Sequence, residues 1–115
     1  MGAQERFAAL VETMVGRGFA THGPSGHDGP RRAFGATSLK TGGRIFAMLV
    51  EGRLVVKLPA PRVDELIAAG AGERFDPGHG RLMKEWLALR ADSDDAWLSL
   101  ATESEAFVAR RRRES

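Results

Sequence analysis

The hydrophobic and polar positions between Phe34 and Pro59 divide into three short runs. Glycine turns at Gly42-Gly43 and at Gly52 separate these runs, which cover residues 35–41, 44–50 and 53–58. Short runs joined by tight glycine turns are typical of an antiparallel meander. The middle run is apolar at nearly every position after Arg44, which predicts a central strand covered on both faces. The third run alternates, which predicts one buried face and one half-exposed face.

Helical periodicity occurs on both sides of this meander. Residues 3–15 carry an apolar stripe at Phe7, Leu10, Val11 and Met14, which predicts a helix that packs on a core. Pro61 suits the first turn of a short helix over residues 61–69. A longer helix is expected from about Ser93 to Arg110, with Asp92 or Ser93 as its N-cap. Its inward stripe is expected at Trp97, Leu100, Ala101, Ser104, Phe107 and Val108.

The remaining segments complete a two-layer α+β fold. Residues 18–32 are rich in Gly, Pro and His and predict a flexible loop, and residues 73–81 predict another. Residues 82–90 alternate and predict a strand, although a helix is also possible over nine residues. We therefore predict one domain over residues 1–115, with an antiparallel meander sheet, helices packed on one face and a basic tail over residues 110–115.

Composition narrows the classes of protein that this chain can be. A length of 115 residues corresponds to one domain, and the chain has no cysteine for disulfides or thiolate chemistry. No apolar run is long enough to span a membrane, so we expect a cytoplasmic protein with no membrane partner. The net charge is +2, and the run Arg110–Arg113 supplies four of the 17 basic residues, so the rest of the chain is nearly neutral. This balance argues against a uniformly basic nucleic-acid module.

Candidate catalytic and metal-binding groups lack the spacing that such sites need. Four side chains have the chemistry of metal ligands: His22, His27, Asp28 and His79. Their spacing matches no standard metal site, and the loop Gly23–Gly29 lacks the Lys-Ser/Thr pair of a phosphate-binding loop. Hydroxyl groups at Ser25, Ser38 and Thr41 do not lie in a Gly-x-Ser-x-Gly elbow. We therefore predict no catalytic residue, no cofactor and no metal, and a protein that is not an enzyme.

The strongest functional candidate is a surface. Basic residues alternate with an aromatic side chain on the strand face opposite the predicted core, and the C-terminal arginines extend this set: Arg53, Val55, Lys57, Lys84, Trp86, Arg90, Arg110, Arg111, Arg112 and Arg113. Such a set can bind nucleic acid through phosphate contacts and stacking. An exposed strip with Val55 and Trp86 could instead form a homodimer seam, or Trp86 could pack under the last helix. The sequence does not choose among these alternatives.

Four segments resemble the TfoX N-terminal domain family of the TfoX/Sxy competence regulators. They are Phe34-Gly35, the run Gly43–Leu49, the run Leu54–Leu58 and the segment Gly80–Trp86. The likeness extends over roughly residues 31–108. The YjbR/MmcQ family, which is similar in the order of its elements, is the second choice.

The resemblance implies a small α+β domain with a noncatalytic regulatory role, exerted in transcription or competence through protein or DNA contacts. It implies no catalytic residue. The chain lacks the companion C-terminal domain of the longer competence regulators, which argues against a competence role. The alternatives are a homodimeric structural domain and a small-ligand-binding module.

Overall fold

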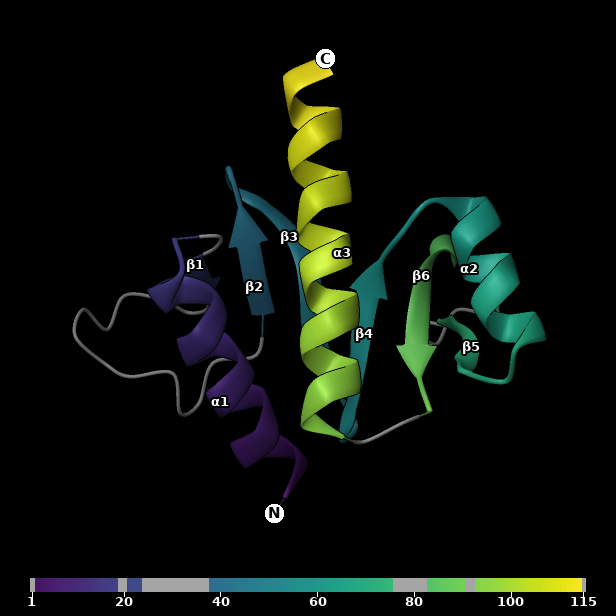
Figure 1. Cartoon of the computed structure of the whole chain (residues 1–115), viewed down its shortest axis with the longest axis horizontal. Helices are drawn as coiled ribbons and strands as arrows, with labels where there is room; N and C mark the ends of the chain where they lie inside the picture. Colours follow the sequence, from purple (N-terminus) through teal and green to yellow (C-terminus); the bar gives the residue numbers. More distant parts are fainter. Residues whose placement is uncertain (1, 19–20, 24–37, 76–82, 91–92, 115) are drawn as a thin grey trace.

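The computed structural model of the chain describes residues 2–18, 21–23, 38–75, 83–90 and 93–114. These residues form three helices and six strands (Figure 1). The helices are α1 (Ala3–Gly16), α2 (Ala60–Ala68) and α3 (Asp94–Glu114). The strands are β1 (Thr21–Gly23), β2 (Ser38–Thr41), β3 (Arg44–Val50), β4 (Arg53–Lys57), β5 (Gly72–Phe75) and β6 (Met83–Leu89).

The six strands form one antiparallel sheet in the order β1-β2-β3-β4-β6-β5. Two-residue turns join β2 to β3 and β3 to β4, as the glycine positions predicted. All four turn residues have positive φ, namely Gly42 at 59°, Gly43 at 83°, Glu51 at 52° and Gly52 at 81°. This combination is typical of the hairpin turns whose twist matches that of the flanking strands. The predicted meander is therefore confirmed.

All three helices pack on the same face of the sheet, where they enclose one hydrophobic core. Helix α1 contributes its predicted stripe, and α3 contributes buried side chains that include Trp97, Ala101 and Phe107. The sheet contributes residues such as Leu54, Val56 and Leu87. The cluster joins elements from both ends of the chain. The two-layer α+β architecture with helices on one face is thus confirmed (Figure 1).

Three boundaries differ from the predictions. Residues 21–23 lie in the predicted flexible loop but form the edge strand β1, and residues 72–75 lie largely in the second predicted loop but form β5. Both strands are too short for an alternating pattern to show in the sequence. The predicted tail from residue 110 continues α3 as far as Glu114, because arginine favours helices and positive charge is stabilised at a helix C-terminus.

Burial of the central strands also differs from the prediction. Strand β3 lies inside the sheet, but Arg44 and Ile45 are exposed and its last three residues are only half-buried. Strand β4 was expected to alternate, yet Leu54, Val55 and Val56 are all buried. Strand β4 lies inside the sheet between β3 and β6, and Val55 and Val56 have ladder partners on both sides.

One glycine permits the close contact between β5 and β6. A Cβ atom on Gly72 would lie 2.4 Å from the carbonyl oxygen of Ala88, which is a backbone atom and cannot swing aside. Gly72 is buried and lies opposite Leu89 in the ladder. The edge strand therefore needs glycine at this position in order to pair with β6.

Candidate functional site

A polar contact from α3 ends the ladder between β3 and β4. Pairing of these strands stops at Ala47 and Val56. Just beyond this pair, the fully buried Ser104 hydroxyl lies 2.7 Å from the Phe46 carbonyl oxygen and 2.6 Å from the Lys57 carbonyl oxygen, and it accepts the Lys57 N–H at 3.2 Å. The hydroxyl replaces the partner that each strand would otherwise provide. The two strands can therefore separate without leaving these backbone groups unpaired.

A hollow of about 290 Å³ lies at this separated end of the sheet. It is lined by the start of β3, the end of β4, one residue of β6 and the last turns of α3, namely Arg44, Ile45, Lys57, Glu85, Val108 and Arg111. The Arg111 guanidinium donates to both carboxylate oxygens of Glu85, at 2.9 and 3.1 Å, and lies 5.2 Å from the centre of the Phe107 ring. The hollow thus contains three cations and one carboxylate.

A second hollow of about 360 Å³ adjoins the first, and both include Lys57 and Glu85. Its other lining residues are Ala60, Lys84 and Trp86. Lys57 lies opposite Trp86 in the ladder between β4 and β6, and its Nζ atom is 5.6 Å from the centre of the indole ring. The Trp86 side chain is only partly buried, so part of the ring faces the hollow. This arrangement places an aromatic surface beside the Lys57 ammonium, in a hollow that Lys84 also lines.

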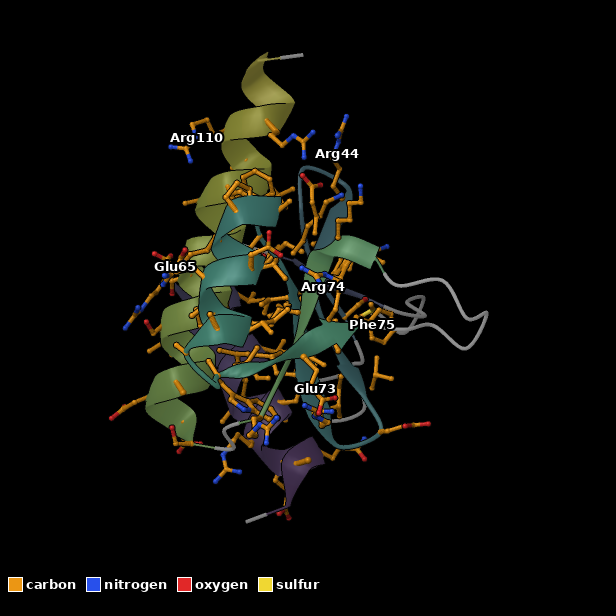
Figure 2. All side chains as sticks on the ribbon, turned by 90° about the vertical axis from the view of Figure 1, so that its right-hand side faces the viewer. Arg44, Glu65, Glu73, Arg74, Phe75 and Arg110 are labelled. Atoms are coloured by element: carbon orange, nitrogen blue, oxygen red, sulfur yellow. The ribbon has the colours of Figure 1, made fainter. Side chains whose placement is uncertain are left out.

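We call the part of the surface that includes both hollows and the exposed Arg110 the basic end. Its side chains are Arg44, Ile45, Lys57, Lys84, Glu85, Trp86, Val108, Arg110 and Arg111. Figure 2 shows Arg44 and Arg110 at the same end of the molecule as the C-terminus of α3, whereas Glu73 lies toward the opposite end. Five of these residues are cations, whereas the described acidic side chains there are Glu85 and, beside Thr41, Glu105. The basic end therefore has an excess of positive charge.

Most cations elsewhere in the described chain form ion pairs that hold the fold together. The pairs are Arg6 with Asp94, Arg53 with Glu73, Arg62 with Glu103 and Glu65, Arg74 with Asp64, and Arg90 with Glu73. Hydrogen bonds from Arg62 to Glu103 and Glu65 raise the pKa of its guanidinium further above its ordinary value. By contrast, Arg44, Lys84 and Arg110 form no ion pair with any residue that the structure describes.

The structure brings together half of the residues predicted for the surface. Lys57, Lys84, Trp86, Arg110 and Arg111 lie at the basic end, whereas the side chains at positions 112 and 113 are outside the described part.

The other three predicted surface residues lie elsewhere. Arg53 donates to the Leu89 and Ala88 carbonyl oxygens at 3.0 and 3.2 Å and, like Arg90, pairs with Glu73. These contacts assign Arg53 a structural role at the opposite end of β4.

The prediction of an exposed Val55 is wrong. This side chain retains 1% of its accessible surface. Its ladder partners are Met48 and Ala88 on the two neighbouring strands. Val55 therefore cannot belong to an apolar strip that is open to a partner.

Sequence reasoning missed three residues of this region. Arg44 was assigned only to a strand, Glu85 to an alternating pattern and Ser104 to an inward helical stripe. The turn at Gly42-Gly43 was a signal for Arg44, because it places the first residue of β3 at the end of the sheet. Nothing in the sequence shows that the Ser104 hydroxyl contacts backbone groups of β3 and β4, since this contact depends on how α3 crosses the strands.

The predicted candidates for metal and acid–base chemistry lie mostly outside the described residues. These are Ser25, His27, Asp28 and His79, as well as the side chain of His22. Thr41 donates to a Glu105 oxygen at 3.2 Å, which gives its hydroxyl a structural partner. Within the described ranges, no three His, Cys, Asp or Glu side chains are grouped as metal ligands would be. The same ranges contain no helix with the length and apolarity of a membrane span.

The fold and this surface together define a small two-layer α+β domain with a basic end. Comparisons of the chain with models of protein families, with curated proteins and with solved structures found no match. The resemblance to the TfoX N-terminal domain therefore stays a prediction.

Proposed function

We propose that this chain is a noncatalytic interaction domain that binds nucleic acid through its basic end. The observation that supports this proposal is the pair of adjoining hollows, in which Lys57 and Lys84 lie beside a partly exposed Trp86 and Arg44 lines the neighbouring hollow, while most cations elsewhere form ion pairs. A regulatory role in transcription or competence, as the TfoX resemblance implies, would use such contacts.

Charge and chemistry favour phosphate as the group that this surface recognises. Lysine and arginine side chains donate to phosphate oxygens, and each phosphate that they neutralise releases counterions from the nucleic acid. The C-terminus of α3 offers no free N–H groups and has a negative partial charge. The side-chain cations must therefore supply the attraction at this end. If they contact about four phosphates of a single strand, raising the salt from about 50 to about 200 mM should weaken binding roughly 50-fold.

Fluorescence anisotropy of a labelled oligonucleotide would test this proposal. Lys84→Glu should weaken binding roughly tenfold at low salt and lower the steepness of the salt dependence by about one. Arg90→Glu is the matched control. Both residues are exposed, Lys84 lies near the start of β6 and Arg90 directly follows its end, and the two substitutions change the net charge equally. Equal effects of the two substitutions, or no binding by the unaltered chain at low salt, would contradict the proposal.

The face of the sheet opposite the helices favours a second candidate, a homodimer. Among the described residues no helix covers this face, Ile45 is 39% exposed, and Met48, Val50 and Phe75 are half-buried. Apolar side chains with this exposure are typical of the core of a subunit interface. Sedimentation equilibrium over a wide concentration range would test the dimer, and Ile45→Glu should then dissociate it. A chain that remains monomeric throughout would exclude this candidate.

A further inference from the structure

We infer that the nucleic acid at the basic end is single-stranded and that one of its bases stacks on Trp86 while Lys57 and Lys84 bind the neighbouring phosphates. This inference rests on the proposed function and names the class of strand that the site accepts. Stacking on Trp86 is then the contact by which the site distinguishes single-stranded from double-stranded nucleic acid.

The geometry of β4 and β6 places the three side chains on one face. Lys57 lies directly across the ladder from Trp86, with its ammonium 5.6 Å from the centre of the ring. Lys84 is two residues before Trp86 on the same strand, so it shares this face at a spacing of about 7 Å. The three side chains line the same hollow, whose volume of about 360 Å³ lies in the range of small-ligand sites. A ring with one ammonium over it and a second lysine in the same hollow supplies a stacking surface and two groups that can bind phosphate.

The partial exposure of Trp86 in a shallow hollow favours a single strand over a duplex. In a duplex, neighbouring base pairs cover both faces of each base, so only base edges and the backbone are accessible. A tryptophan ring stacks on a base that is free of its neighbours, as bases in single strands are. The partly exposed indole in this shallow hollow therefore favours a free base over a base within a duplex.

The adjoining hollow extends the path of the strand beyond the stacked base. It shares Lys57 with the hollow of Trp86 and adds Arg44 and Arg111 from β3 and α3. A strand that leaves Trp86 in this direction would place its next phosphate beside these two guanidinium groups. Glu85 lies in both hollows and is already paired with Arg111, so a phosphate there would compete with a carboxylate of the protein itself.

Tryptophan fluorescence of the full chain provides a direct readout. The chain has two tryptophans, and Trp97 is buried in the core with 1% exposure. Three probes would be titrated at low salt: a dT oligomer of about 12 nucleotides, a duplex of the same length and inorganic polyphosphate, which carries charge without bases. We expect the dT oligomer to bind most tightly and to quench the emission, whereas polyphosphate binds without quenching.

Two variants separate stacking from charge. Trp86→Leu should weaken binding of the dT oligomer roughly 5- to 100-fold and leave binding of polyphosphate unchanged. Trp86→Phe retains a ring, so it should abolish the quenching but keep the affinity within a few-fold. Circular dichroism of both variants would show whether the fold is intact, and Trp86→Phe keeps the test valid if Trp86→Leu unfolds.

The possible results distinguish this inference from the proposed function. Salt-dependent binding of all three probes without quenching and without an effect of Trp86→Leu would overturn the inference but not the proposed function. Tighter binding of the duplex would have the same consequence. No binding of any probe at low salt would overturn both.

Discussion

Replacement of Ser104 by alanine tests how much the contact between α3 and the separated ends of β3 and β4 contributes to stability. The substitution removes one oxygen atom that contacts the Phe46 carbonyl, the Lys57 carbonyl and the Lys57 N–H. A hydroxyl has one proton, so it donates to one of the two carbonyls at a time. At least one carbonyl and one N–H therefore lose a partner at a site where Ser104 itself is fully buried.

The expected cost follows from these two groups. A buried backbone group without a partner costs about 1–3 kcal/mol, and alanine regains up to about 0.5 kcal/mol as the better helix former. Two such groups cost about 2–6 kcal/mol when both are fully buried. Because the two contacts with Lys57 are only part-buried, we expect Ser104→Ala to lower the free energy of unfolding by about 2–3 kcal/mol, a large share of the roughly 5–15 kcal/mol that a domain of this size has.

Urea unfolding followed by circular dichroism measures this loss. Ser99→Ala is the matched control, because Ser99 is exposed on the same helix and its replacement should raise the stability by a few tenths of a kcal/mol. Hydrogen exchange of the Lys57 amide should also accelerate in the Ser104 variant. The reasoning is refuted if the two variants agree within about 0.5 kcal/mol.

Two further substitutions test the sheet and the basic end. Gly72→Ala should lower the free energy of unfolding by about 1–3 kcal/mol because its Cβ would meet a backbone oxygen, whereas Gly16→Ala, which meets nothing within 4 Å, should raise it by up to about 1 kcal/mol. Urea unfolding that ranks the two variants in the reverse order would contradict the close contact of β5 with β6. Glu85→Gln should tighten oligonucleotide binding roughly threefold to tenfold, because it removes a carboxylate from both hollows. Weaker binding in an anisotropy titration would show that the pair with Arg111 supports the site instead.

The parts of the fold that depend on local sequence patterns could be predicted from the sequence. The stripe of α1 has a period of 3.6 and the run of β4 a period of 2. The two glycine turns and the continuous apolar run of β3 are also local features that short segments of sequence reveal. The short strands β1 and β5 contain three and four residues and have no readable period. Their pairing depends on β2 and β6, so only the assembled sheet defines them.

Half of the candidate site could be predicted from the sequence, because local alternation shows which side chains share a face but not which contacts they make. Alternation along β4 and β6 placed Lys57, Lys84 and Trp86 on one face, and the ladder between these strands confirms that they are neighbours. The same alternation could not show that Val55 is buried, because burial depends on which residues pack around the side chain in the folded chain. It also could not show that Arg53 binds carbonyl oxygens of β6, because that contact joins residues that are 35 and 36 positions apart.

A two-dimensional ¹H–¹⁵N spectrum of the chain, recorded during titration with a dT oligomer, tests the central claim most directly. The account predicts that the amides of Arg44, Lys57 and Arg111 and the indole N–H of Trp86 shift together with one dissociation constant. The indole N–H of the buried Trp97 and the amide of Arg90 should remain in place. Shifts that centre on Arg53 and Arg90, or a spectrum that does not change at low salt, would contradict a nucleic-acid site at the basic end.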